Sequence, residues 1–255
     1  MSFKTIVFYS LKGGVGRTTV AANIGMGLQS ANRRVLLVDA DPQNALGLHA
    51  GMDVGERFGL ARDGISATHV NDYIASFGDR AHTVVPHLPF GHCTRQEGNE
   101  LERQILKNPE WFKTRLRDRV PVDIDVVVVD AAPGTGALSQ QALAVADLVV
   151  VVLQPDAASY VTVPTIGEFA TGLADVPRAY LINGLDTRLP LHRDVRAALA
   201  DALGPACLPW AIPYEPALGE ALAKRKTLAE YAPDSHVLQD FHEVSKWIIR
   251  SLPEL

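Results

Sequence analysis

The sequence predicts an α/β protein whose doubly wound, mostly parallel sheet is flanked by helices, and three observations support this prediction. Four apolar runs are nearly continuous, which is typical of parallel strands buried on both faces. These runs are residues 4–10, 34–39, 123–130 and 148–153. Residues 17–30, between the first two runs, carry apolar side chains at helical spacing. Two runs end in carboxylates, at Asp39 and Asp130, and ligands of doubly wound folds collect at the carboxyl ends of strands.

A glycine-rich segment joins the first apolar run to the first predicted helix. It reads Lys12-Gly13-Gly14-Val15-Gly16-Arg17-Thr18-Thr19. Glycine takes positive φ at little cost and lets backbone N–H groups approach an anion, and the following helix adds its unpaired N–H groups and its dipole. Of the two threonines in the first turn, one hydroxyl can ligate Mg²⁺ while the other caps the helix or touches a phosphate. The segment therefore predicts a phosphate-binding loop, with a glycine-rich turn that binds nothing as the alternative.

The loop departs from the ordinary G-x-x-x-x-G-K-[ST] pattern, because Leu11 replaces the first glycine and Arg17 replaces the lysine. An additional lysine, Lys12, supports the interpretation all the same. The string from Lys12 to Thr19 resembles the deviant Walker A loop of the MinD/ParA ATPase superfamily, in which this lysine reaches across a dimer to the partner's nucleotide. The resemblance implies a P-loop NTPase that binds ATP and Mg²⁺ and forms a nucleotide-sandwich homodimer. The nucleotide-binding residues that it implies here are Lys12, Gly13, Gly14, Val15, Gly16, Arg17, Thr18 and Thr19.

The segment after the second apolar run, Asp39-Ala40-Asp41-Pro42-Gln43-Asn44, resembles the D-x-D-P-Q switch I segment of the same superfamily. The resemblance implies that Asp41 orients or deprotonates the attacking water and that Asp39 supports the magnesium environment. Taken alone, the pattern is equally consistent with an Asx-type turn. Together with the Lys12 loop it favours phosphoryl transfer, in which the protein mainly positions groups and balances charge.

The run at residues 123–130 predicts the most strongly buried strand, and Ala131-Ala132-Pro133-Gly134 follows it. It resembles a Walker B strand that enters switch II, which implies that Asp130 holds Mg²⁺ through a water molecule and that loop amides sense the γ-phosphate. The metal-binding residues that the resemblance implies are Thr18, Asp41 and Asp130. The residues that it implies in catalysis are Lys12, Arg17 and Asp41.

The resemblance also implies two contacts to the base. A strand predicted at residues 178–182 ends at Asn183, where superfamily members place an asparagine whose amide reads adenine. Residues 210–215 resemble the loop that wraps the other side of adenine, which implies a contact from Pro213. A lone asparagine at the end of a strand is usually a turn residue, so only its place in the chain supports the role of Asn183.

The remaining segments are less informative. Helices are predicted at residues 68–77, 162–172 and 234–252, a strand at 81–88, and two helices within 96–119 separated at Asn108-Pro109. We interpret the charges of residues 96–119 as a solvated face, with partner docking as the alternative. The apolar stripe of the last helix is expected to close the core. MinD carries a basic, membrane-inserting helix beyond this point, and nothing comparable follows here, so no direct membrane-targeting helix is expected.

The composition predicts one cytoplasmic domain. The 255 residues suit a single P-loop ATPase domain over 1–255. The net charge of −5 gives no strong nucleic-acid signature, and we interpret the basic cluster at 224–226 as solvated surface. Cys93 and Cys207 are too few for a disulfide framework, and the chain shows neither a signal peptide nor an apolar run of membrane-spanning length.

Several short patches resemble the ATPase accessory of bacterial cellulose secretion, the BcsQ or YhjQ type. They are Arg17 in the loop, Leu88-Pro89-Phe90-Gly91, Asn108-Pro109-Glu110-Trp111 and Leu228-Ala229-Glu230-Tyr231. The resemblance implies a dimer that supports assembly, activity or localisation of a cellulose synthase secretion complex. It also implies cellulose synthase accessory or inner-membrane subunits as partners, which recruit the protein to the inner membrane.

Arg17 bears most directly on the mechanism. Lysine presents a compact ammonium, whereas arginine presents a wide planar fork that still bonds phosphate. Losing the correct placement of that cation in the transition state costs on the order of 100-fold in rate, so we predict a slow ATPase whose bound state carries the signal. The alternatives are a ParA- or MinD-type ATPase that positions DNA or another cargo, and a scaffold that has lost catalysis. An iron–sulfur reductase is disfavoured, because no cysteine directly follows Asp130-Ala131-Ala132-Pro133.

Overall fold

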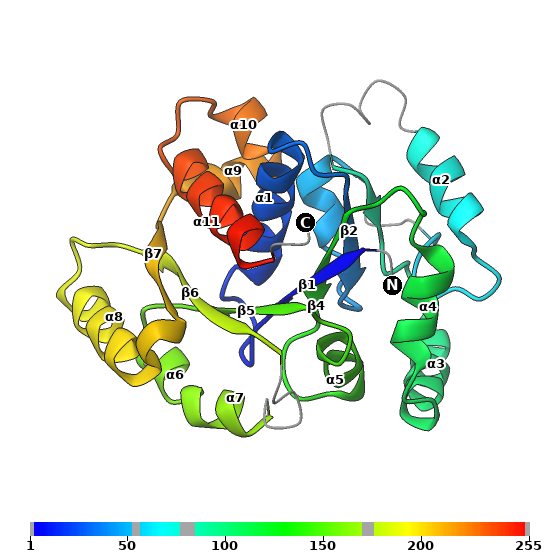
Figure 1. Cartoon of the computed structure of the whole chain (residues 1–255), viewed down its shortest axis with the longest axis horizontal. Helices are drawn as coiled ribbons and strands as arrows, with labels where there is room; N and C mark the ends of the chain where they lie inside the picture. The colour runs from blue at the N-terminus through cyan, green and yellow to red at the C-terminus, as the bar shows by residue number, and fades with distance from the viewer. Residues whose placement is uncertain (1–2, 53–56, 77–84, 170–175, 253–255) are drawn as a thin grey trace.

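The computed structural model describes residues 3–52, 57–76, 85–169 and 176–252. Within these ranges seven parallel strands form one sheet in the order β3-β2-β4-β1-β5-β6-β7 (Figure 1). The strands are β1 (Lys4–Tyr9), β2 (Val35–Ala40), β3 (His87–Leu88), β4 (Val126–Ala131), β5 (Leu148–Leu153), β6 (Arg178–Leu185) and β7 (Cys207–Pro213). The predicted doubly wound parallel sheet is confirmed, and the four apolar runs are its adjacent strands β2, β4, β1 and β5.

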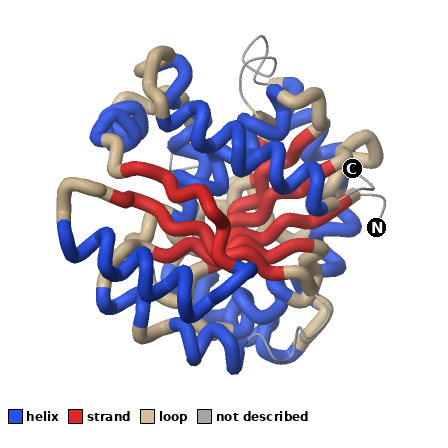
Figure 2. The backbone as a smooth tube through the Cα atoms, turned by 60° about the vertical axis from the view of Figure 1, so that its left-hand side comes forward, coloured by secondary structure: helices blue, strands red, loops and turns tan. Residues whose placement is uncertain are grey.

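Helices cover both faces of this sheet (Figure 2). The longer helices are α1 (Arg17–Ser30), α2 (Ala67–Ala75), α3 (Arg95–Lys107), α4 (Trp111–Arg119), α8 (Pro190–Leu203), α9 (Pro216–Ala223) and α11 (Val237–Ser251). The shorter ones are η1 (Leu46–Ala50), α5 (Ala137–Leu143), α6 (Ala157–Tyr160), α7 (Val163–Phe169), η4 (Gly204–Ala206) and α10 (Leu228–Tyr231). Side chains of α1 and α11 join the apolar layer on one face, and those of α4, α5, α7 and α8 join the layer on the other.

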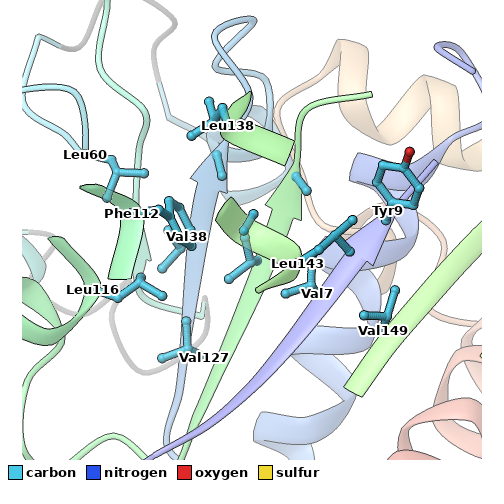
Figure 3. Close-up of a cluster of buried hydrophobic side chains, with 14 of the residues drawn as sticks. Val7, Tyr9, Val38, Leu60, Phe112, Leu116, Val127, Leu138, Leu143 and Val149 are labelled. Atoms are coloured by element: carbon cyan, nitrogen blue, oxygen red, sulfur yellow. The ribbon is translucent and has the colours of Figure 1, made fainter. Parts of the chain in front are cut away.

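Side chains along each central strand alternate between these two layers, as the period of two in a strand requires. In β1, Val7 packs in the layer of α4 and α5, whereas Ile6 packs in the layer of α1 and α11. Figure 3 shows the layer of α4 and α5, where residues of β1, β2 and β4 meet Leu143 of α5 and Phe112 of α4. All six residues of β4 are buried, so the prediction of a strand enclosed on both faces is confirmed.

The register of the strands brings the acidic residues together at one edge. Asp39 of β2 lies directly opposite Asp130 of β4, and Phe8 of β1 lies opposite Asp130 on the other side. The loop that leaves β1 therefore begins beside both carboxylates. This edge carries the candidate site.

Two predicted boundaries are wrong at the far side of the sheet. Strand β6 continues through Asn183 instead of ending at it, and residues 210–213 belong to strand β7 instead of a loop. Gly184, at φ +73°, allows the irregular pairing between β6 and β7. Pro213 is tolerated as the last residue of β7 because β7 is an edge strand, where the missing N–H breaks no ladder.

The other predicted elements lie close to their expected positions. Helices α7 and α11 lie inside their predicted ranges, and α2 begins one residue before its predicted range. Helices α3 and α4 are separated at Asn108-Pro109 as predicted. Of the strand predicted at 81–88, only β3 is observed, and residues 77, 81–84 and 170–172 lie outside the described residues. No helix within the described ranges combines the length and the hydropathy of a membrane-spanning segment.

Gln141 of α5 holds the break between α3 and α4. Its amide nitrogen donates to the carbonyl oxygens of Ile105, at 2.8 Å, and Asn108, at 2.9 Å. Its Oε1 accepts the backbone N–H of Phe112 at 3.0 Å. The proline after Asn108 prevents a continuous helix, so these backbone groups need a partner from elsewhere. One side chain supplies all three hydrogen bonds.

Replacing Gln141 with leucine should lower the free energy of unfolding by on the order of 3 kcal/mol, because it leaves several backbone groups without partners. Urea denaturation followed by circular dichroism measures the change. The matched control is Gln140→Leu, since the Gln140 side chain is exposed and donates to the carbonyl of Thr135 at the surface. This control should change stability by less than about 0.5 kcal/mol. Equal losses in the two variants would contradict the proposed role of Gln141.

Candidate nucleotide-binding site

The loop between β1 and α1 wraps around a cavity of about 360 Å³. Gly14 and Gly16 have φ angles of +77° and +81°, a region that favours glycine. Gly16 is also the N-cap of α1 and forms no side-chain cap, so the first N–H groups of this helix point to the loop without a capping side chain. The cavity is lined by Ser10, Gly13, Gly14, Val15, Gly16, Arg17, Thr18, Asp41, Gln43, Ala45, Asp130 and Pro133. The structure thus brings most of the predicted site residues to one cavity.

Arg17 lies buried between two of the three predicted metal ligands, Asp41 and Asp130. Its Nε donates to Asp130 Oδ1 at 2.5 Å, its Nη2 to Asp41 Oδ2 at 2.8 Å, and its Nη1 to Ser10 Oγ at 3.5 Å. Burial lowers the pKa of Arg17, but the charges and hydrogen bonds of Asp130 and Asp41 outweigh burial and raise that pKa above its ordinary value. The guanidinium is therefore charged, and in this structure it bridges two acids.

Thr18 donates to one acid of the cavity, and Asp39 holds the backbone that follows β2. Thr18 Oγ1 donates to Asp130 Oδ2 at 2.7 Å. The two carboxylate oxygens of Asp39 accept the backbone N–H groups of Asp41 and Leu46, each at 2.9 Å. Burial, with a contribution from the neighbouring Asp130, raises the pKa of Asp39 well above its ordinary value. Asp39 is not among the lining residues of the cavity, so its expected support of a metal is indirect, through the backbone that carries Asp41.

Lys12 is bound within its own chain. Its Nζ lies 2.6 Å from Asp156 Oδ2 in an ion pair that is about one-third exposed. Asp156 also caps α6, because its Oδ1 accepts the N–H of Ser159 at 2.6 Å. Burial raises the pKa of Asp156, but the hydrogen bonds from Lys12 and Ser159 outweigh burial and lower that pKa below its ordinary value. Lys12 is not among the residues that line the cavity. A chain that used Lys12 to bind its own nucleotide would place the side chain there.

The two predicted adenine contacts lie on neighbouring strands beside the loop. Asn183 Nδ2 donates to the carbonyl oxygen of Val15 at 2.8 Å. Pro213 pairs in register with Leu185, two residues beyond Asn183. A Cβ added at Gly16 would lie 2.3 Å from Asn183 Nδ2, so the loop and this amide are in tight contact.

Replacing Gly16 with alanine should weaken nucleotide binding by at least about tenfold, because the methyl group displaces Asn183 and the positive φ is strained for alanine. Equilibrium titration with a fluorescent ATP analogue measures this. Gly98→Ala in α3 is the matched control, since a Cβ at Gly98 meets nothing within 4 Å, its φ is not positive and it does not line the cavity. If both substitutions reduce affinity equally, the contact between Gly16 and Asn183 has no special role.

Three residues near the loop were not assigned a role from the sequence. Asp156 and Gln154 follow β5, and Gln154 Nε2 donates to the carbonyl of Gly14 at 3.4 Å. His49 of η1 lies 3.3 Å from Thr19 Oγ1, through Nε2, and burial lowers its pKa to about 4. Polar residues at the carboxyl end of β5 carry a sequence signal, because ligands gather at such ends. His49 carries no comparable signal.

The oxygen donors around the cavity fit Mg²⁺ in combination with a phosphate ligand. Among the described residues, no group of three or more His, Cys, Asp or Glu side chains could hold a metal ion. Thr18, Asp41 and Asp130 nevertheless place hard oxygen atoms around one cavity. Mg²⁺ keeps several water ligands and is commonly held by one or two carboxylates plus substrate phosphates.

The parallel sheet, the glycine loop at the start of α1 and the acids at the ends of β2 and β4 define the class of MinD/ParA-type P-loop ATPases. Within this class the chain belongs to the family described as cellulose biosynthesis protein BcsQ, whose model matches residues 3–249.

Curated proteins agree with this class, and solved structures share its fold. The chain is 35% identical over 161 residues to the chromosome partitioning protein ParA of Myxococcus xanthus, a match that covers 59% of this chain but only 52% of that protein. It is 29% identical over 262 residues to the chromosome-partitioning ATPase Soj of Thermus thermophilus, with 98% and 97% covered.

Two solved structures share the fold. The cell division ATPase MinD of Pyrococcus furiosus matches with a TM-score of 0.72 and 22% identity over 98% of this chain and 100% of that one. Cobyrinic acid a,c-diamide synthase of Mycobacterium smegmatis, with a bound ATP analog and magnesium, matches with a TM-score of 0.71 and 24% identity over 98% and 96%.

Proposed function

We propose that this chain is an ATP-binding, slowly hydrolysing dimerisation switch that supports assembly, activity or localisation of a bacterial cellulose synthase secretion complex. Membership of the BcsQ family supports the cellulose part of the proposal. The observation that carries the switch is the arrangement of the loop. A cavity of about 360 Å³ is lined by Arg17, Asp41 and Asp130, and Asp156 holds Lys12 in an ion pair.

The loop and the start of α1 bind the phosphates in this proposal. Gly13 to Gly16 offer backbone N–H groups, and α1 adds the positive end of its dipole. Thr18, Asp41 and Asp130 hold Mg²⁺, which when bound neutralises phosphate charge and orients the phosphate oxygens. The magnesium and ATP analog in the related synthase structure support this ligand pair. Thr19 is the last residue of the phosphate-binding segment Lys12–Thr19. Asn183 and Pro213 contact the adenine.

Asp41 acts in hydrolysis as the group that orients the attacking water and accepts its proton. Its carboxylate lines the cavity while its Oδ1 accepts the N–H of Gln43 at 2.9 Å, which fixes the direction of the side chain. Arg17 stands where a P-loop lysine is usual, and its fork is placed differently from an ammonium. Slow turnover follows, because phosphoryl transfer depends on the accurate placement of charge.

Lys12 converts nucleotide binding into dimerisation. In one chain its ammonium is bound to Asp156, and in the dimer it leaves that partner and reaches the phosphates held by the second copy. The dimer is the form that partner subunits of the cellulose synthase complex recognise. The protein itself is cytoplasmic and reaches the inner membrane through those partners.

Light scattering with ATP, with ADP and without nucleotide, paired with a phosphate-release assay, tests the switch. We expect a dimer with ATP, a monomer without nucleotide, and phosphate release that is slow compared with ordinary P-loop ATPases. A molecular mass that does not respond to ATP would overturn the dimerisation switch. Deletion of the gene in its host, followed by measurement of secreted cellulose, tests the cellulose role.

The alternative is a ParA- or MinD-type ATPase that positions DNA or another cargo. The likeness to chromosome-partitioning Soj over nearly the whole chain favours it. This function needs a basic, salt-sensitive surface, whereas the chain has a net charge of −5. A DNA mobility-shift assay with ATP at low salt distinguishes the two, since only the alternative expects a shift.

A further inference from the structure

Arg17 engages the oxygen atoms that would otherwise face a metal. Its Nε and Nη2 donate to Asp130 Oδ1 and Asp41 Oδ2 at 2.5 and 2.8 Å. The second oxygen of Asp130 accepts the Thr18 hydroxyl at 2.7 Å. The arginine side chain is only 6% exposed, so solvent hardly screens these interactions. Thr18, Asp41 and Asp130, the three proposed metal ligands, are therefore all hydrogen-bonded to groups of the chain itself.

The charge at this place is nearly balanced already. Asp41 and Asp130 bring two carboxylates, and Arg17 brings one positive charge between them. A divalent cation on the same carboxylates would come close to the guanidinium, and two positive charges repel strongly in a buried site. Mg²⁺ can gain these oxygens only by weakening their bonds to Arg17.

The geometry of the side chain makes this competition specific to arginine. A guanidinium has five N–H donors in a planar fork, so it can keep both carboxylates and still offer N–H groups to a phosphate. A lysine at the same place has one nitrogen on a shorter stem and cannot bridge the two acids in this way. A lysine would therefore compete less strongly with the metal for the two carboxylates.

We infer that Arg17 is a built-in competitor of Mg²⁺ at Asp41 and Asp130, and that it allows the chain to hold a nucleoside triphosphate with little help from the metal. The inference rests on the proposed function, since it concerns how the same cavity holds its nucleotide. It adds a regulatory consequence: nucleotide loading responds only weakly to the concentration of free Mg²⁺.

Binding of a fluorescent ATP analogue to the full chain, in excess MgCl₂ and in EDTA, tests the inference. For the wild type we expect the dissociation constant to change less than about threefold when Mg²⁺ is removed. For Arg17→Lys we expect affinity to fall at least about tenfold in EDTA, which corresponds to about 1.4 kcal/mol. Arg34→Lys is the matched control, because Arg34 pairs with Asp125 on an exposed surface and should behave as the wild type.

A second readout uses the metal alone. Mg²⁺ without nucleotide should raise the melting temperature of Arg17→Lys and of Arg17→Gln, whose free carboxylates bind it, but not that of the wild type. Equal metal dependence of nucleotide affinity in the wild type and in Arg17→Lys overturns the inference and leaves the proposed function intact. Failure of the wild type to bind nucleotide under either condition overturns both.

Discussion

Asp41→Asn should reduce single-turnover phosphate release by at least about 100-fold, while ATP remains bound. The amide keeps the size of the side chain and its acceptor oxygen for the N–H of Gln43, but it can neither accept a proton nor balance the charge of Arg17. Release of phosphate from pre-bound ATP, followed over hours with an excess of protein, measures the rate.

The control is Asp147→Asn. Asp147 accepts the N–H of Thr5 at 2.7 Å, lies at the opposite end of β1 and takes no part in the proposed chemistry, so this variant should hydrolyse ATP at the wild-type rate. Unchanged hydrolysis in Asp41→Asn would exclude Asp41 as the group that activates water. It would favour a scaffold in which the nucleotide has only a structural role.

Lys12→Ala should weaken the ATP-dependent dimer by at least about 100-fold, because two charge-assisted hydrogen bonds, one from each copy, are lost together and each contributes about 1.5–3 kcal/mol. Analytical ultracentrifugation over a range of protein concentrations gives the dimer dissociation constant. Lys246→Ala is the matched control, since Lys246 forms an exposed ion pair with Glu243 on α11 and should leave the constant unchanged.

Asp156→Asn tests the other half of the same switch. It removes the charge that holds Lys12 in one chain, so it should strengthen the ATP-dependent dimer. The α6 cap need not be lost, because an asparagine side chain also accepts the N–H of Ser159. A dimer weakened by Asp156→Asn and untouched by Lys12→Ala would refute the idea that Lys12 exchanges one partner for another.

The central fold and the cavity could be predicted because their signals are local in the sequence. A buried parallel strand appears in the sequence as an apolar run. The glycines and acids at the strand ends identify the loop between β1 and α1 and the carboxylates beside it. Helix α8 was not predicted, although Val195, Leu199 and Leu203 recur at helical spacing and pack on the sheet.

Other features could not be predicted because they depend on distant partners. The ion pair of Lys12 joins residues 144 positions apart, and the hydrogen bond of Asn183 to the loop spans 168. The bridge from Arg17 to two acids was missed for the same reason, since an arginine beside a phosphate loop suggests the phosphate first. The ends of β6 and β7 were misjudged because Asn183, Gly184 and Pro213 are turn residues that an irregular edge of a sheet accommodates.

The amide of Asn183 ties two kinds of recognition to one side chain. If adenine engages this amide as proposed, the hydrogen bond that steadies the carbonyl of Val15 must adjust at the same moment. A guanosine nucleotide, whose base presents a different edge, would leave the loop less ordered and its triphosphate less firmly held. Discrimination between adenine and guanine would then appear as a difference in how firmly the loop binds the triphosphate, although the base itself contacts Asn183.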